Sequence, residues 1–200
     1  MDITLLGFLL IIAGYLIGSL SSAIILCKLA GLPDPRTEGS GNPGATNVMR
    51  IGGKKLAALT LVGDLLKGLM PVVIARLLGQ SELVIALVAV AAFMGHLFPL
   101  FFGFKGGKGV ATALGAILGL NFWVALCALG VWLLVFISTK ISSLSALIAA
   151  VSAPIFLFLF DASSATVWAV IFMDILLIYR HKANIQRLLS GQEGKLKAKK

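Results

Sequence analysis

The sequence has few charged residues. Only 12% of its 200 residues are Asp, Glu, Lys or Arg, whereas 59% are hydrophobic. Water-soluble domains have about 25% charged residues, so the composition excludes an ordinary soluble protein. The apolar runs are continuous rather than alternating, which favours spanning helices over a closed barrel as the way to satisfy backbone groups in lipid. We therefore expect an all-α, polytopic membrane protein that forms a single domain over residues 1–200.

Cysteine is also scarce. The two cysteines, Cys27 and Cys127, both lie in apolar segments, so neither a disulfide nor a metal pair is indicated. The first three residues carry no basic group, so we expect no cleavable signal peptide and a first helix that stays in the protein.

Several patterns that carry chemistry in other proteins are missing. There is no HExxH pattern and no acidic cluster for Mg²⁺, so we expect neither a metal nor a cofactor. The pair Gly107-Lys108 is followed by Gly109 instead of Ser or Thr, which argues against a Walker A nucleotide site. No Ser-His-Asp order and no His-x4-Asp pair is evident. Any reaction must therefore depend mainly on positioning and charge neutralisation.

Seven apolar segments make up most of the chain. The fourth is short, because a full span needs roughly 20 residues, so it is either half-depth or preceded by a partly re-entrant loop. Pro71 is expected to kink the second segment. The segments cover residues 3–30, 56–78, 83–101, 110–120, 121–137, 144–160 and 165–179.

The basic residues indicate an orientation. The net charge is +9, and of the 17 Lys and Arg residues only Lys67 and Arg76 fall outside the cytoplasmic loops and tail when the N-terminus is placed outside. This distribution follows the positive-inside rule, so we expect seven spans, a cytoplasmic C-terminus and a basic tail over residues 191–200. A five-span arrangement would keep the same orientation. The charge indicates membrane lipid and anionic substrates as partners, and no nucleic acid is expected.

A polar stretch with the sequence GSGNPGATNVMR separates the first two segments at residues 39–50. Its glycines and proline exclude a regular element up to residue 44, and a short helix from Asn47 can project Arg50 back toward the loop. The alternative is a solvated connector. We favour a functional loop, because a simple linker rarely needs this much glycine, amide and hydroxyl chemistry.

A glycine–lysine loop, residues 103–109 with the sequence GFKGGKG, separates the third and fourth segments. Successive glycine N–H groups can converge on one anion, and Lys105 and Lys108 add full positive charges. This loop predicts a phosphate site.

Asp64, Lys67 and His96 are ionisable residues that lie within or at the edge of the spans. Asp64 and Lys67 are three residues apart and share a helix face, so they form either a self-satisfied ion pair or a support beneath the polar site. His96 lies near the membrane boundary, where it serves either packing or the site. The tail repeats polar residues at helical spacing, with His181 and Asn184 on one face.

The predicted orientation gathers the polar residues of four distant segments on the cytoplasmic face. Together they form an electropositive site that suits two phosphorylated substrates. The candidate residues are Ser40, Asn42, Asn47, Arg50, His96, Lys105, Gly106, Gly107, Lys108, Gly109, Ser143, His181 and Asn184.

Three of these stretches together resemble the motifs of the bacterial PlsY family, the acyl-phosphate:glycerol-3-phosphate acyltransferases. They are residues 39–50, residues 95–99 with 104–112, and residues 181–188. The resemblance extends over nearly the whole chain. It implies a seven-helix enzyme of the bacterial inner membrane, with a cytoplasmic active site, that makes 1-acyl-glycerol 3-phosphate in the first step of phospholipid synthesis. It also implies acyl phosphate and glycerol 3-phosphate as substrates, and no acyl-CoA.

On this basis ten of the thirteen candidate residues have an expected role. Ser40, Arg50 and Lys108 bind the phosphate of glycerol 3-phosphate. The amides of Gly106, Gly107 and Gly109, with Lys105, hold the donor phosphate and the developing oxyanion. Ser143, His181 and Asn184 orient the attacking 1-hydroxyl. The general base is either His181 or the phosphate of the substrate itself.

The competing function is a carrier or channel for an organic phosphate. A carrier predicts an inverted repeat and a site at the membrane midplane. No repeat is visible in the sequence, and the polar motifs are expected at one face.

Overall fold

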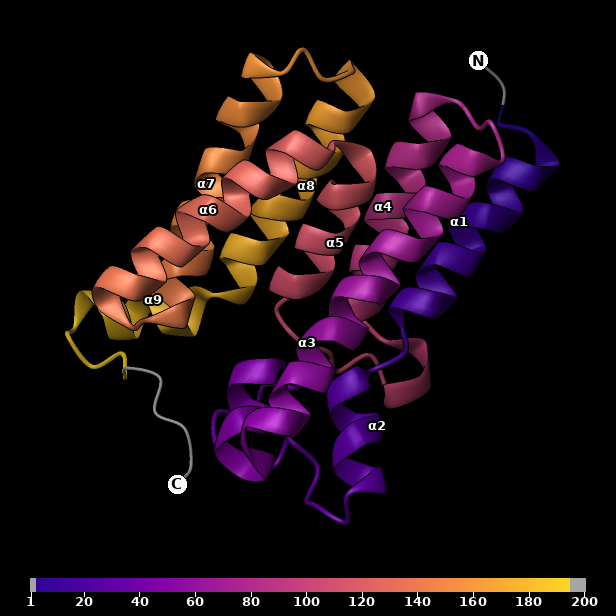
Figure 1. Cartoon of the computed structure of the whole chain (residues 1–200). Helices are drawn as coiled ribbons and strands as arrows, with labels where there is room; N and C mark the ends of the chain where they lie inside the picture. The colour runs from indigo at the N-terminus through magenta and orange to yellow at the C-terminus, as the bar shows by residue number, and fades with distance from the viewer. Residues whose placement is uncertain (1–2, 195–200) are drawn as a thin grey trace.

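The computed structural model describes residues 3–194. The predictions for the basic tail beyond residue 194 therefore fall outside the described residues. Within them the chain is helical (Figure 1). The helices are α1 Leu5–Gly18, α2 Ser22–Leu29, α3 Ala45–Leu77, α4 Glu82–Leu97, the 3₁₀ turn η1 Leu100–Phe102, α5 Val110–Leu120, α6 Phe122–Thr139, α7 Ser142–Leu159, α8 Ser164–Arg180 and α9 Lys182–Leu189.

Four of these helices are long and apolar enough to cross a membrane. They are α3, α4 with η1, α6 and α7, and the count rises to six if the bent pairs α1–α2 and α8–α9 each form one span. Helix α5 has 11 residues and does not qualify, as its predicted shortness anticipated. The structure thus supports an all-helical polytopic membrane protein with four to six candidate spans, fewer than the seven predicted.

The first apolar segment is broken rather than continuous. Helices α1 and α2 meet at an angle of 43°. The Ser21 side chain caps α2 by accepting from the Ile24 N–H at 3.4 Å, and Lys67 Nζ donates to the Leu20 carbonyl at 2.8 Å. The broken backbone therefore regains partners from a serine cap and from a lysine of another helix.

Helix α3 starts earlier than the predicted 56–78 segment. The short helix expected near Asn47 is its first part, which Gly53 (φ 81°, ψ −175°) separates from the long spanning part. Gly53 adopts a backbone conformation that residues with a Cβ rarely reach. The non-helical backbone inside α3 is at Gly53, not at Pro71 as expected for a kink.

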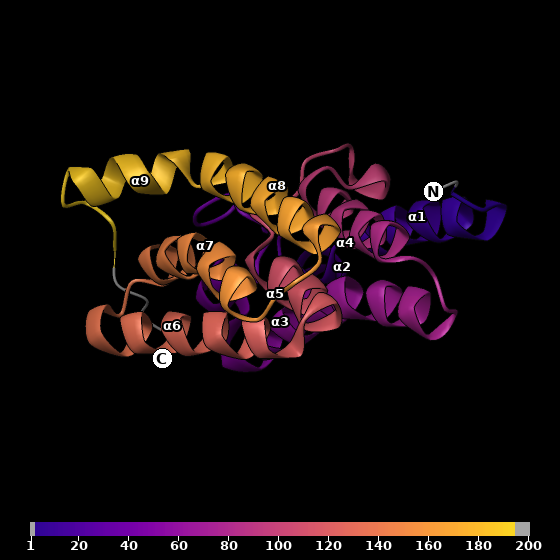
Figure 2. The ribbon, with the colours of Figure 1, turned by 90° about the horizontal axis from the view of Figure 1, so that it is seen from above.

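Helix α4 lies at the centre of the bundle and packs against α1, α3, α5 and α8. Its side chains Val88, Phe93 and Leu97 are fully buried in the main core. Figure 2 shows α7 lying between α6 and α8, in agreement with the contacts of α7 with both helices.

Helices α3 and α5 approach unusually closely. A Cβ on Gly68 would lie 2.2 Å from the Thr112 carbonyl oxygen, and one on Gly115 would lie 2.0 Å from that of Leu65. Small residues at such a crossing let two backbones touch, which is a common way for helices to associate in lipid. This contact fixes α5, and with it the loop that precedes α5.

The two ends of the bundle differ. One end, here called the loop end, carries the first loop (residues 31–44), the glycine–lysine loop and α9, and the N-terminus lies at the opposite end (Figure 1). Side chains of the α3–α4, α5–α6 and α7–α8 connections share one pocket at that opposite end. Large apolar side chains such as Leu134 and Phe158 are exposed around the bundle, as a lipid-facing surface requires.

Candidate functional site

The first loop is wrapped around one buried side chain. Asn47, which is 1% exposed, accepts from the Ser40 N–H at 2.9 Å. It donates to the carbonyls of Pro35 at 2.8 Å and Glu38 at 2.9 Å. The carboxamide oxygen and both N–H donors of Asn47 are therefore used to hold the loop that carries Ser40.

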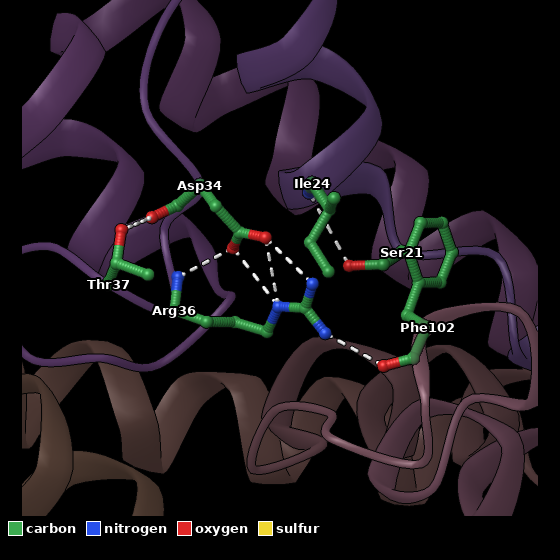
Figure 3. A network of polar contacts seen from close by, with 6 residues as sticks. All are labelled: Ser21, Ile24, Asp34, Arg36, Thr37 and Phe102. Carbon is green, nitrogen blue, oxygen red and sulfur yellow. Dashed lines mark hydrogen bonds and ion pairs between the residues drawn. The ribbon is translucent and has the colours of Figure 1, made fainter.

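An arginine ties the first loop to the segment before the glycine–lysine loop (Figure 3). Asp34 pairs with the Arg36 guanidinium at 2.7 Å, and Arg36 Nη1 donates to the Phe102 carbonyl at 2.7 Å. Hydrogen bonds from Arg36 hold the pKa of Asp34 below its ordinary value. The first loop is thus connected to η1 through one charge-assisted hydrogen bond, from a guanidinium that Asp34 holds in place.

The glycine–lysine loop lies directly on α4. A Cβ on Gly106 would lie 2.0 Å from the His96 carbonyl oxygen, and one on Gly107 would lie 2.3 Å from His96 Nε2. A Cβ on Gly109 (φ 86°) would lie 2.3 Å from the Phe93 ring. The Gly107 N–H also donates to the His96 carbonyl at 3.2 Å. Glycine is therefore required here for close packing, and the Gly107 amide already has a protein partner.

The buried pair of Asp64 and Lys67 lies next to His96. Lys67 Nζ lies 2.8 Å from Asp64 Oδ1, and His96 Nδ1 lies 3.8 Å from the same oxygen. All three side chains are buried. Asp64 and Lys67 form the expected ion pair, and they connect the break at Leu20 with the floor of the glycine–lysine loop. His96 lies under the loop rather than in the cavity above it.

Lys108 lies at the centre of the site. Its Nζ donates to Asn184 Oδ1. Burial lowers the pKa of Lys108 to about 8, and the charges of Arg187, Arg180 and Arg50 act in the same direction, whereas Glu193 opposes them. Four cations from three different segments thus converge, and such a cluster attracts phosphate.

His181 occupies the 59° bend between α8 and α9. Its Nδ1 lies 2.8 Å from the Leu177 carbonyl oxygen, and because a carbonyl can only accept, Nδ1 carries the proton. The other nitrogen, Nε2, is left as a hydrogen-bond acceptor. Burial lowers the pKa of His181 to about 4, so the ring is neutral at physiological pH.

Glu193 joins the residues of α7 and α9. Its Oε1 accepts from Ser143 Oγ and from Asn184 Nδ2, each at 2.5 Å, and its Oε2 accepts from Arg187 Nε at 2.6 Å. Although burial raises it, these hydrogen bonds bring the pKa of Glu193 below its ordinary value. The carboxylate fixes Ser143 against Asn184.

A cavity of about 240 Å³ opens between the first loop, the glycine–lysine loop and the end of α8. Its size fits a small phosphorylated molecule, and its lining is cationic and rich in hydroxyl and amide groups. The lining residues are Ser40, Gly41, Asn42, Gly106, Lys108, Tyr179, Arg180 and Lys182.

The structure brings together six of the thirteen predicted site residues, whereas Arg50 is exposed and does not line the cavity. Ser40, Asn42, Gly106 and Lys108 share the cavity, and Lys108 bonds Asn184 beside Ser143 and Glu193. Lys105 has an exposed side chain and does not line this cavity.

Sequence reasoning missed three charged residues, Arg36, Arg180 and Glu193. Two of them bind backbone carbonyls of a distant loop, which the sequence does not signal. Among the described residues no cluster of three or more His, Cys, Asp or Glu side chains is arranged to hold a metal. The geometry suits the binding and orientation of anions.

Comparisons with known proteins agree on one family. The family model described as glycerol-3-phosphate acyltransferase matches residues 8–191. A glycerol-3-phosphate acyltransferase of Thioalkalivibrio sulfidiphilus is 56% identical, covering 96% of this chain and 95% of its own length. That of Methylococcus capsulatus is 55% identical, covering 96% and 98%.

Solved structures give the same result. The crystal structure of PlsY (YgiH), an integral membrane glycerol 3-phosphate acyltransferase, in its glycerol 3-phosphate form, superposes with a TM-score of 0.91 at 42% identity over 96% of each chain. Its lysophosphatidic acid form gives a TM-score of 0.88 at 42% identity over 94% of each chain.

Proposed function

The chain belongs to the glycerol-3-phosphate acyltransferase family, and we propose that it takes its acyl group from acyl phosphate. It is an integral membrane glycerol-3-phosphate acyltransferase that produces lysophosphatidate for phospholipid synthesis. The observation that carries the proposal is the position of Lys108, which lines the cavity together with Arg180 and donates to Asn184, itself joined to Ser143 through Glu193.

Two anionic substrates explain this concentration of positive charge. Glycerol 3-phosphate and acyl phosphate repel each other, and cations shared between them offset that repulsion. We assign Ser40, Arg50 and Lys108 to the phosphate of glycerol 3-phosphate. The donor phosphate is assigned to the start of α5, where the first N–H groups of the helix point toward the loop and Gly109 offers no side-chain cap.

The chemical step needs little beyond orientation, because an acyl phosphate is already activated. The 1-hydroxyl oxygen bonds to the acyl carbon, the bond from that carbon to the phosphate oxygen breaks, and inorganic phosphate leaves with the electron pair. Ser143, Asn184 and His181 Nε2 orient the hydroxyl. The acyl chain lies in lipid or between helices. No cofactor and no acyl-CoA enter this scheme.

The hydroxyl proton goes to the substrate's own phosphate in this proposal. A histidine with a pKa of about 4 is a weak base, whereas a phosphate monoester has a second pKa of about 6. Before the step the hydroxyl donates its hydrogen bond to His181 Nε2; during the step this hydrogen passes to the phosphate, so His181 orients the hydroxyl and stays unprotonated. His181→Gln, which keeps an acceptor, should retain much more transfer activity than His181→Ala. Equal loss in both variants would make His181 the base instead.

The donor assignment is tested with protein purified in detergent. With acyl phosphate we expect release of inorganic phosphate that depends on glycerol 3-phosphate, and with acyl-CoA we expect no acylated product. Product formed from acyl-CoA at a comparable rate would refute the assignment.

We further propose seven passages of the membrane, of which the 11-residue α5 is the shortest, an outside N-terminus and the loop end in the cytoplasm of a bacterial inner membrane. The exposed Ser164 and Ser190 provide a matched test in a variant without Cys27 and Cys127. In intact cells a membrane-impermeant thiol reagent should label Ser164→Cys and spare Ser190→Cys. The reverse pattern would invert the topology.

A further inference from the structure

Arg180, the last residue of α8, forms two hydrogen bonds with the glycine–lysine loop. Its Nη2 donates to the Gly106 carbonyl at 2.7 Å and its Nε donates to the Gly107 carbonyl at 3.1 Å. The guanidinium also lies 5.8 Å from the centre of the Phe98 ring. Nε and Nη2 are on one edge of the rigid guanidinium, so the fork matches two successive carbonyls in a way that a lysine ammonium does not.

These bonds fix the two peptide planes that precede Lys108. In a trans peptide the carbonyl and the following N–H point in opposite directions. The plane between Gly106 and Gly107 is held at both ends, by Arg180 on the carbonyl and by the His96 carbonyl on the N–H. The plane between Gly107 and Lys108 is held by Arg180 on the Gly107 carbonyl.

The direction in which Lys108 leaves the loop is thus set from α8. Glycines give a loop no stiffness of their own, so two adjacent glycines before a central cation need an external support. The guanidinium also covers two carbonyl oxygens, whose negative ends would otherwise repel a phosphate in the cavity that Arg180 itself lines.

The same residue links the loop to the bend at His181. Arg180 directly precedes His181, and Asn184, one turn further on, accepts from Lys108 Nζ. A displacement of the α8 end would therefore move His181, Asn184 and the loop together.

We propose that Arg180 is a positioning residue of the acyl transfer: its fork to the Gly106 and Gly107 carbonyls holds Lys108 and the start of α5 in register with His181 and Asn184. The inference rests on the proposed function where it is tested by acyl-transfer activity, whereas its test by hydrogen–deuterium exchange depends only on the structure of the loop.

The test compares Arg180→Gln and Arg180→Lys with matched changes at Arg76. Arg76 provides the control because it also donates to two successive carbonyls, those of Gly119 at 3.3 Å and Leu120 at 3.1 Å, but at the opposite end of α5. We expect both Arg180 variants to lose at least about tenfold in kcat/KM, since retained charge does not replace a fork. Arg76→Gln and Arg76→Lys should stay near wild type.

Hydrogen–deuterium exchange of peptides covering residues 103–109 gives the second readout. Exchange should rise in both Arg180 variants and stay unchanged in both Arg76 variants. Arg180→Lys with wild-type kcat/KM and unchanged loop exchange would overturn the proposal, because Arg180 would then act only as a charge. If Arg180→Gln does not fold, Arg180→Lys, which keeps a cation beside Phe98, decides the matter. If the wild-type protein transfers no acyl group, the proposed function fails, and the exchange data still test whether the Arg180 hydrogen bonds hold the loop.

Discussion

Replacing Asn47 with alanine removes the hydrogen bonds that shape the first loop. The variant loses one bond to the Ser40 N–H and two to the Pro35 and Glu38 carbonyls. Each such bond contributes about 1 kcal/mol net, so the arrangement of the loop loses about 3 kcal/mol. The broken partners are backbone groups, and alanine offers them nothing in return.

This loss should be visible in catalysis, because Ser40 and Asn42 line the cavity that we propose for glycerol 3-phosphate. If the ordered loop must be re-formed on substrate binding, about 3 kcal/mol corresponds to a fall of roughly 100-fold in kcat/KM for glycerol 3-phosphate. The assay is the initial rate of lysophosphatidate formation by purified protein over a range of glycerol 3-phosphate concentrations.

A matched asparagine lies at the opposite end of the bundle. Asn121 caps α6 by accepting from the Val124 N–H at 3.1 Å. Asn121→Ala should lower thermal stability by about 1 kcal/mol, in the usual range for a lost cap, and leave the rate of transfer unchanged. A value of kcat/KM for Asn47→Ala within about threefold of wild type would refute the reasoning, since roughly 0.6 kcal/mol is less than one such bond.

Three further predictions follow from single contacts. Because the pKa of Lys108 is lowered to about 8, its charge is lost as the pH rises through that value; kcat/KM for glycerol 3-phosphate should fall there, and Lys108→Arg should move the fall to higher pH. The pKa of Glu193 is lowered, so its carboxylate stabilises the fold at pH values above its ordinary pKa, and this stabilisation is lost as the pH falls. Glu193→Gln should therefore lower Tm at neutral pH. In thermal unfolding, the difference in Tm from wild type should shrink toward about pH 4. Gly115→Ala should lower Tm by several degrees, since its Cβ would meet the Leu65 carbonyl at 2.0 Å, whereas Gly130→Ala, with nothing within 4 Å, should not.

The sequence predicts that its polar stretches meet at one end of the bundle, and this prediction rests on composition and on the distribution of the basic residues. Polar stretches between apolar segments must lie at one end or the other of a helical bundle, and the basic residues indicate which end they share. Lys108 and Asn184, 76 residues apart, form a hydrogen bond in the structure. The pairing of Asp64 with Lys67 follows from helical spacing alone.

The contacts that position the site were not predictable in the same way. Arg36 and Arg180 act on backbone carbonyls, and any residue type can supply such a carbonyl. The break between α1 and α2 depends on Lys67 reaching the Leu20 carbonyl from another helix. In each case the signal is a distance between remote segments, which one sequence does not contain.

The sequence shows where the loop needs glycine, but only part of the reason for it. The glycine–lysine loop was expected to need glycine for N–H groups that face an anion. In the structure Gly106 and Gly107 are required first because His96 leaves no room for a Cβ. The glycine pattern can be read from the sequence, whereas the close contact between this loop and α4 cannot.

The central claim is that residues from distant segments form one active site at the loop end. The most direct measurement is the rate of acyl transfer by Arg50→Ala, Lys108→Ala and His181→Ala, compared with Arg76→Ala from the opposite end, in membranes with matched expression. We predict a loss of at least about tenfold for each of the first three, as for removal of a charged or hydrogen-bonding group from a reacting site, and a near-normal rate for Arg76→Ala. Near-normal rates for all three site variants would contradict the account.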